Sequence, residues 1–465
     1  MIKSIIKNTF VYAVLPHVAK IFGLFTLPLI MKYLTAKDFG VYASIIVFST
    51  LLSFSKDLGL YNSFFVSYYN YNKNFKLVWN RLFGILTIWS ILYSFLVYLF
   101  LYYALVYILD VKENINLLLI SIILPVLLFD NLIMISSILL RLQKNIFYTS
   151  IVYMISGLLT LFFNIFFIVF LKLGYLGFFF SLFISTLFVF VCFLFKVVIR
   201  NRLYPVFDFN YYRLKSFLKV GLPMVPHNYS SYMISSSDKV IMNHYNFSIN
   251  TVGEYSFGST ISNYFAPIDN AIGFVFYPYY IENISNNESA KNKKLILISH
   301  ILIFLITVSM AIWAKEIFSL ITRNIEFRKS YIFFIFFIMA YNYRPFYMAT
   351  TWHLIQQEKT KALMKISLAA GVISVFSNFF LLSFSNVLVS SVVYFFSFMY
   401  LGFINVFIEK GNLPLKLNYI FYLIIILFTT YSLYIISDLN FIYKFFFHLV
   451  VIIYLAYIYL KIKNI

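Results

Sequence analysis

The chain has 465 residues, of which 62% are hydrophobic and only 11% are charged. This composition excludes a soluble globular protein, because no single core can bury so much apolar surface. The formal charge of +20 lies mostly in short loops between apolar runs, which indicates the loop bias of a membrane protein rather than nucleic-acid binding. One cysteine and six scattered histidines without an HExxH motif predict no disulfide, no metal site and no cofactor.

Apolar runs follow one another along the whole chain. A membrane span needs about 20 mostly apolar residues, so the apolar content allows roughly 14 spans. The first run follows Lys3 and Lys7 and continues past Leu27 without an A-x-A site, so we predict a span there rather than a cleaved signal peptide. The predicted spans are 9–31, 41–65, 82–108, 117–139, 148–171, 174–197, 217–242, 252–280, 295–314, 331–352, 363–384, 387–408, 418–437 and 440–460. The fold class is therefore an all-α polytopic membrane protein.

Basic residues predict the orientation of these spans. With the N-terminus inside, 23 lysines and arginines lie in cytoplasmic segments and about nine lie on the opposite side. The positive-inside rule then predicts both termini in the cytoplasm. No loop exceeds about 25 residues, which leaves no room for a soluble catalytic domain.

The sequence also repeats itself. Gly40-Val-Tyr42 matches Gly253-Glu-Tyr255 at an offset of 213 residues, and the segment 157–164 matches 371–378 at an offset of 214. Six spans separate the copies, so both have the same orientation, and we predict two parallel lobes. The predicted regions are a six-helix lobe at 1–198, a cytoplasmic linker at 199–216, a second six-helix lobe at 217–408, and two additional helices at 409–465.

These motifs carry a resemblance to a family. The run Leu34-Thr-Ala-Lys-Asp-Phe-Gly-Val-Tyr42 after the first span, followed by Asp57-Leu-Gly59, resembles the opening of Wzx-type polysaccharide repeat-unit flippases. In the second lobe, Gly221-Leu-Pro223, Ser237-Asp-Lys239 and Val252-Gly-Glu-Tyr255 resemble the same family at its seventh and eighth spans. The family is part of the multidrug/oligosaccharidyl-lipid/polysaccharide superfamily, and the resemblance covers essentially the whole chain.

The resemblance implies a bacterial inner-membrane protein that is not an enzyme. It would move an undecaprenyl-diphosphate-linked oligosaccharide from the cytoplasmic to the periplasmic leaflet by alternating access, for O-antigen or another surface polysaccharide. A polysaccharide polymerase and a chain-length regulator are the protein partners that it suggests, beside the lipid bilayer. It does not identify the glycan.

Ionisable residues inside spans are the candidate site residues, because each costs roughly 2.5–3.5 kcal/mol at the bilayer centre and usually marks a pathway. A diphosphate would be bound by basic side chains, through ammonium charges or the planar guanidinium fork. The candidates for diphosphate binding are Lys20, Arg344, Lys56 and Lys239.

The intramembrane acids are candidates for coupling to a proton or sodium gradient. They are Asp130, Asp269, Asp57 and Asp238. Four bases and four acids balance, so ion pairing between spans is the structural alternative for the whole set. Three tyrosines, Tyr255, Tyr264 and Tyr341, are candidates for stacking on sugar rings.

Two other functions compete with a flippase. A cation-coupled multidrug exporter of the same superfamily usually stops at twelve spans, so the last two predicted helices disfavour it. A membrane polysaccharide polymerase or glycosyltransferase needs a large extramembrane loop, which this chain lacks. A lipid-II-type flippase is a close relative of the favoured function.

Overall fold

The helices of this chain pack as two units. The computed structural model describes residues 18–53, 55–61, 64, 68, 75–109, 114–143, 145–208, 210–222, 224–285, 288–356, 359–408, 418–438 and 440–463. Unit 1 consists of Met1–Tyr232 and Asn246–Asn250, and unit 2 of Met233–Tyr245 and Thr251–Ile465. In the described ranges every regular element is a helix, which confirms the all-α prediction.

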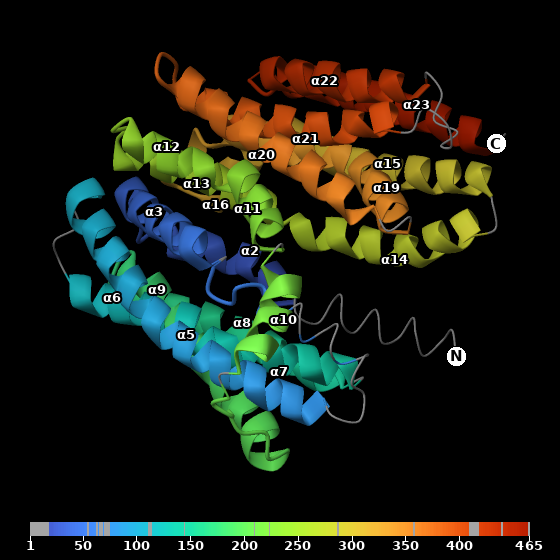
Figure 1. Ribbon diagram of the computed structural model, residues 1–465. Coiled ribbons are helices and arrows are strands. Elements are labelled where there is room, and N and C mark those ends of the chain that lie inside the picture. Colours follow the sequence, from blue (N-terminus) through green and yellow to red (C-terminus); the bar gives the residue numbers. More distant parts are fainter. Residues whose placement is uncertain are drawn as a thin grey trace. The chain divides into compact units, whose positions relative to one another are not determined.

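Unit 1 contains most of the first half of the chain (Figure 1). Its α-helices are α2 (Val18–Ile30), α3 (Ala36–Ser53), α5 (Phe75–Tyr103), α6 (Ile115–Ile123), α7 (Asp130–Leu142), α8 (Ile146–Asn164), α9 (Leu176–Phe193), α10 (Tyr211–Gly221) and most of α11 (Met224–Ser235). Wider π-turns extend four of the spans, as η3 (Ala104–Ile108), η4 (Leu124–Phe129), η5 (Ile165–Phe170) and η6 (Leu194–Arg200).

Unit 2 contains the second half of the chain, with α13 crossing its boundary. Its helices are α12 (Ser237–His244), α13 (Ile249–Asn263), α14 (Ala266–Ser285), α15 (Ser289–Ile312), α16 (Ala314–Ile321), α17 (Ile325–Arg328), α18 (Tyr331–Ala340), the 3₁₀ turn η7 (Tyr341–Tyr343), α19 (Arg344–Gln356), α20 (Thr360–Leu382), α21 (Leu388–Ile408), α22 (Asn418–Ile436) and α23 (Phe441–Lys463).

Taken with their interruptions, the described helices form fourteen membrane-length segments that coincide with the predicted spans. Seven continuous stretches are long and apolar enough to cross a bilayer by length and composition. Three shorter apolar helices follow in α21, α22 and α23. The seventh predicted span, 217–242, begins later than expected, because residues up to Gly221 belong to α10 and Ser236 separates α11 from α12.

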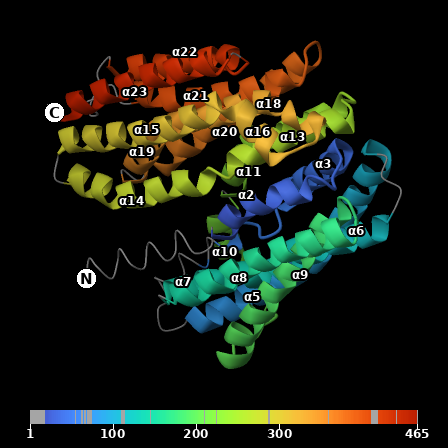
Figure 2. The same ribbon diagram turned by 180° about the vertical axis from the view of Figure 1, so that it is seen from behind.

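Unit 1 is held together by an apolar core among α5, α7, α8 and α9, which run side by side (Figure 2). Trp79, Leu139 and Phe193 are fully buried in it. The start of α3 is fixed by a capping box: the hydroxyl of Thr35 accepts a hydrogen bond from the Asp38 N–H at 3.1 Å, and the Asp38 carboxylate accepts one from the Thr35 N–H at 3.0 Å. Such caps satisfy amides that a helix start leaves without partners.

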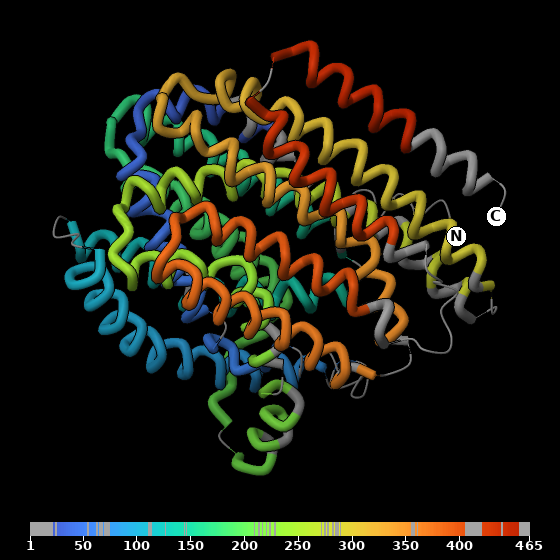
Figure 3. The backbone as a smooth tube through the Cα atoms, turned by 90° about the horizontal axis from the view of Figure 1, so that it is seen from above, coloured from blue at the N-terminus to red at the C-terminus, as the bar shows by residue number. Residues whose placement is uncertain are grey.

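The two additional C-terminal helices belong to unit 2. Helix α23 packs on α15, and α22 packs on α18 and α21 (Figure 3). Polar contacts join one end of this group: the Lys444 ammonium lies 2.6 Å from a Glu316 carboxylate oxygen, and Asp438 accepts hydrogen bonds from Lys315 and Tyr331, both at 2.8 Å. These two hydrogen bonds hold the pKa of Asp438 below its usual range.

We expect this contact to be asymmetric in its energetics. Lys444 is fully buried, whereas the Glu316 side chain is 45% exposed. Glu316→Ala would leave a buried charge without its partner, and we expect a cost of about 3 kcal/mol, at the low end for a broken buried pair. Lys444→Met would leave only a hydrated carboxylate, and we expect about 1 kcal/mol or less. Thermal unfolding of the purified variants in detergent checks this order, and equal losses would contradict it.

Candidate functional site

In each unit, the second span is broken inside the membrane segment. In unit 1, α3 ends at Ser53, and Leu58 and Gly59 have positive φ angles of 51° and 72° before the helix resumes at Leu60. In unit 2, α13 ends at Asn263 and α14 begins at Ala266. Broken helices are tolerated at membrane depth only where they face protein or a water-lined cavity, and in transporters they surround substrate and ion sites.

The fourth and tenth spans are irregular at their own midpoints. The π-turn η4 ends at Phe129 and the α-helical geometry resumes at Asp130. The 3₁₀ turn η7 ends at Tyr343 and α19 begins at Arg344. In both units, therefore, a change of helix type directly precedes a charged residue.

An ion pair joins the two irregular spans of each unit. In unit 1, the Lys56 ammonium contacts the Asp130 carboxylate, and both side chains are largely buried. In unit 2, Nε of Arg344 lies 2.8 Å from Oδ2 of Asp269. The structure therefore brings together four of the eight predicted site residues, and each base meets an acid from another span.

The two ion pairs occupy corresponding positions of the sequence repeat. Lys56 and Asp269 are 213 residues apart, and Asp130 and Arg344 are 214 residues apart. These are the offsets of the Gly-x-Tyr and Gly-to-Asn matches. The charge is reversed: the base lies on the second span in unit 1 and on the corresponding tenth span in unit 2.

The unit 2 pair leaves polar atoms available. Asp269 is only 1% exposed, and its Oδ1 has no hydrogen-bond partner among the described residues. The Arg344 side chain is 27% exposed, and within the described chain its recorded hydrogen bond uses Nε alone. A guanidinium has five N–H donors, so its terminal nitrogens are available to a further anion. One turn away, Gly273 of α14 and Met348 of α19 line a narrow apolar pocket.

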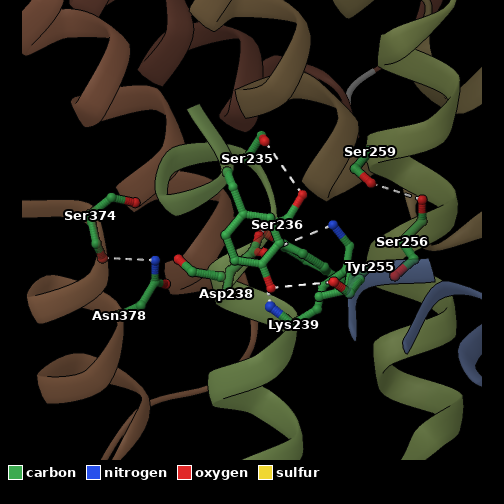
Figure 4. A network of polar contacts seen from close by, with 12 residues as sticks. Ser235, Ser236, Asp238, Lys239, Tyr255, Ser256, Ser259, Ser374 and Asn378 are labelled. Carbon is green, nitrogen blue, oxygen red and sulfur yellow. Dashed lines mark hydrogen bonds and ion pairs between the residues drawn. The ribbon is translucent and has the colours of Figure 1, made fainter. Parts of the chain in front are cut away.

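A second polar cluster lies at the break between α11 and α12, also in unit 2 (Figure 4). The buried carboxylate of Asp238 accepts hydrogen bonds from the Tyr255 hydroxyl and from the Lys239 N–H. The Lys239 ammonium lies 3.8 Å from Asp238 and 5.6 Å from the centre of the Tyr255 ring. The charge of this carboxylate is thus already balanced by a neighbour in sequence.

Three oxygens on the helices around this cluster lack partners among the described residues. They are Oγ of Ser256, Oγ of Ser374 and Oδ1 of Asn378, from α13 and α20, which Figure 4 shows on either side of Asp238. Oxygen ligands of this kind suit a hard cation or an ordered water. Among the described residues there is no group of three or more histidine, cysteine, aspartate or glutamate side chains that would hold a metal ion.

The other predicted residues have different surroundings. Asp57 lies in the turn that breaks the second span, where its carboxylate accepts hydrogen bonds from the backbone N–H groups of Gly59 and Tyr61. Lys20 lies on α2, and its side chain is outside the described residues. Tyr255 is fully buried with its hydroxyl on Asp238, so its predicted stacking on sugar rings is wrong.

Sequence reasoning missed two buried side chains of unit 2. Lys444 lies in the first turn of α23 and is neutralised by Glu316. His300 of α15 is fully buried against the rings of Phe304 and Phe346, and neither ring nitrogen has a partner among the described residues. The available signal was a lone ionisable residue within an apolar run.

The comparisons with known proteins agree with this geometry. The sequence model of the family described as "Polysaccharide biosynthesis protein" matches residues 5–284. The chain belongs to this family. Among curated proteins, none matches the chain in sequence.

Solved structures show the fold. The lipid II flippase MurJ in an inward closed conformation is similar at a TM-score of 0.72 and 14% identity, over 97% of this chain and 98% of that one. An inward-facing multidrug resistance MATE family transporter of the MOP superfamily gives 0.62 and 12%, over 91% and 99%. The Vibrio cholerae MATE transporter VcmN gives 0.56 and 14%, over 87% and 96%. The family and the fold are those of transporters rather than enzymes.

The reversed charges of the two ion pairs generate a swap experiment. Lys56→Ala and Asp130→Ala each leave one charge unpaired, at a cost of about 1–3 kcal/mol, below that of a fully buried pair. The exchange Lys56→Asp with Asp130→Lys restores an opposite pair in the polarity that unit 2 already has. We expect the exchange to recover most of the membrane expression and thermal stability that each alanine variant loses. If the exchange is as unstable as the alanine variants added together, the pairing does not stabilise unit 1.

Proposed function

We propose that this protein is a flippase for undecaprenyl-diphosphate-linked oligosaccharide repeat units in the synthesis of O-antigen or another surface polysaccharide. The observation that carries the proposal is the partly exposed guanidinium of Arg344, held by Asp269 at a helix break inside the membrane, in a chain of the polysaccharide biosynthesis family. In the proposed mechanism the diphosphate enters from the cytoplasmic leaflet, the two predicted lobes rock, and the headgroup leaves on the periplasmic side.

The chemistry of Arg344 suits a diphosphate. Its planar fork matches two phosphate oxygens at once, and hydrogen bonds of this charged type are the strong ones. The Nη groups are the donors offered to substrate, while Nε stays on Asp269 and fixes the orientation of the plane. Lys20 remains a proposed second contact. Lys56 and Lys239 are better assigned to holding Asp130 and Asp238.

Asp269 is the best of the four candidates for ion coupling. The carboxylates of Asp57, Asp130 and Asp238 are engaged by backbone N–H groups, Lys56 or Tyr255. Asp269 instead keeps Oδ1 without a partner in the described part of the chain. A proton or sodium ion bound there would weaken its attraction for Arg344 and free the guanidinium for the diphosphate.

A multidrug exporter is the alternative, and its support is the fold similarity to MATE transporters. Packing of α22 and α23 on unit 2 favours the flippase, since such exporters usually have twelve spans. The proposed location is the bacterial inner membrane with both termini in the cytoplasm. A polymerase and a chain-length regulator are its proposed protein partners.

Complementation tests the function and the site separately. The wild-type chain, Arg344→Ala and Arg344→Lys are expressed in a bacterium that lacks its own O-antigen flippase, and surface polysaccharide is measured on gels at matched membrane levels. Wild type should restore polysaccharide. Loss of charged hydrogen bonds worth about 1.5–3 kcal/mol should reduce Arg344→Ala roughly 10- to 150-fold, with Arg344→Lys between them.

The outcomes distinguish the two claims. Full restoration by Arg344→Ala would keep the flippase and reject Arg344 as its diphosphate contact. If wild type fails with the glycans of several host strains and instead lowers drug accumulation, the exporter is the function. Lys20→Ala beside each Arg344 variant measures whether a second base contributes.

The coupling proposal has its own measurement. Asp269→Asn removes the titratable group but keeps the side chain's size. We expect headgroup translocation by the purified protein in vesicles to respond to an imposed pH or sodium gradient in wild type and not in Asp269→Asn. Asp57→Asn is the matched control, because its carboxylate is held by backbone N–H groups. An Asp269→Asn protein that keeps the gradient response rejects the assignment.

A further inference from the structure

The segment that follows the sixth span is fixed against unit 1 outside its helix bundle. After η6 ends at Arg200, Leu203 is buried in the unit 1 core. The Val206 N–H donates to the Asn80 carbonyl at 2.9 Å, and Arg81 pairs with Asp208 at 3.1 Å. Residues 199–219, hereafter the linker, are thus held in place along the first turns of α5.

The linker has an apolar inner side and a basic, aromatic outer side. Leu214, Phe217 and Leu218 of α10 pack against the unit 1 core. On the outer side, Tyr212 is 81% exposed, and Lys215 lies 5.8 Å from the ring of the exposed Tyr211. The exposed aromatic and basic residues of the linker are Arg200, Arg202, Tyr204, Phe207, Tyr211, Tyr212, Lys215 and Lys219.

The charge of this segment is strongly one-sided. Its basic residues are Arg200, Arg202, Arg213, Lys215 and Lys219, and Asp208 is its one acid in the sequence. That acid is paired with Arg81 of α5. The exposed cations therefore have no acidic neighbour within the linker left to balance them.

The length of the third span fixes the depth of the linker. Helix α5 and η3 together run over 34 residues, which is about 51 Å at 1.5 Å per residue. The hydrocarbon core is about 30 Å thick, so about 10 Å, or roughly seven residues, extends beyond it at each end if the excess is shared equally. Asn80 and Arg81 are the sixth and seventh residues of α5, and the linker is attached there.

We infer that the linker lies in the lipid headgroup layer and binds anionic phospholipids. Tyrosine and phenylalanine rings favour the membrane interface, and lysine and arginine beside them attract anionic headgroups. The inner side of α10 is occupied by unit 1, so it is the exposed aromatic and basic side that meets the bilayer surface. This binding is independent of the transported substrate.

A probe on the outer side tests the inference in the whole protein. Tyr212→Cys in a Cys192→Ser background is labelled with an environment-sensitive NBD fluorophore, and the protein is placed in nanodiscs of phosphatidylcholine with or without phosphatidylglycerol. We expect phosphatidylglycerol to shift the emission to the blue and to lower iodide quenching by about threefold or more, since each basic residue near an anionic surface adds roughly fivefold in affinity.

Charge variants assign the effect to the linker. The variant Arg200→Gln, Arg202→Gln, Lys215→Gln, Lys219→Gln should abolish the phosphatidylglycerol response. The pair Lys215→Gln, Lys219→Gln should reduce it, and both positions are exposed on α10, so folding is not at risk. The matched control removes four lysines of unit 2, at positions 293, 294, 361 and 365, and should leave the response intact.

Three results would overturn the inference. Equal quenching in both nanodiscs means that the linker does not select anionic lipid. An equal loss of the response in the unit 2 control means that the effect is only total charge. Reversal by inorganic phosphate, but not by chloride at the same ionic strength, means that the linker binds a free phosphate rather than the lipid surface.

Discussion

The cost of placing a charge in a bilayer is the constraint on which this structure depends. An unpaired ionisable group at membrane depth costs roughly 2.5–3.5 kcal/mol, and this chain carries eight of them in its predicted spans. The structure meets the cost by pairing Lys56 with Asp130, Arg344 with Asp269, and Lys239 with Asp238. Two of these contacts join separate spans at the points where their helices are broken or change type. Pairing thereby fixes which irregular spans lie together in each unit.

The repeat makes the requirement for pairing visible. Corresponding positions of the two units carry opposite charges, so what the position needs is a partner of the other sign and not a particular residue. The two pairs differ in what they leave over. Lys56 and Asp130 satisfy each other, whereas Arg344 keeps its terminal nitrogens, and Asp269 keeps a buried oxygen without a partner among the described residues. A duplicated structural contact in unit 1 has therefore acquired, in unit 2, the unused donors and acceptor that a functional site requires.

Hydropathy and the repeat were enough to predict the fold, because the bilayer forces apolar length on each span and the motifs recur at one offset. The contacts of the site were not predictable in the same way. Lys56 and Asp130 are 74 residues apart and Arg344 and Asp269 are 75 apart, and side chains adjacent in sequence do not face each other on a helix. The repeat held the missing signal, since its offset relates Lys56 to Asp269 and Asp130 to Arg344. Tyr255 was misread because a buried hydroxyl bound to a carboxylate looks, in sequence, like any aromatic residue of a span.

In the proposed mechanism, substrate binding and ion coupling are two sides of one contact. A diphosphate that draws Arg344 away leaves Asp269 with an uncompensated charge in a buried position, and this raises its affinity for a proton or sodium ion. By thermodynamic linkage the ion must raise the affinity of Arg344 for the diphosphate by the same factor. Sequence reasoning treated the bases as substrate ligands and the acids as ion ligands, because it had no means of joining them. Once they are joined, no separate relay between the two sites is needed, since the hydrogen bond from Nε to Oδ2 is itself the coupling.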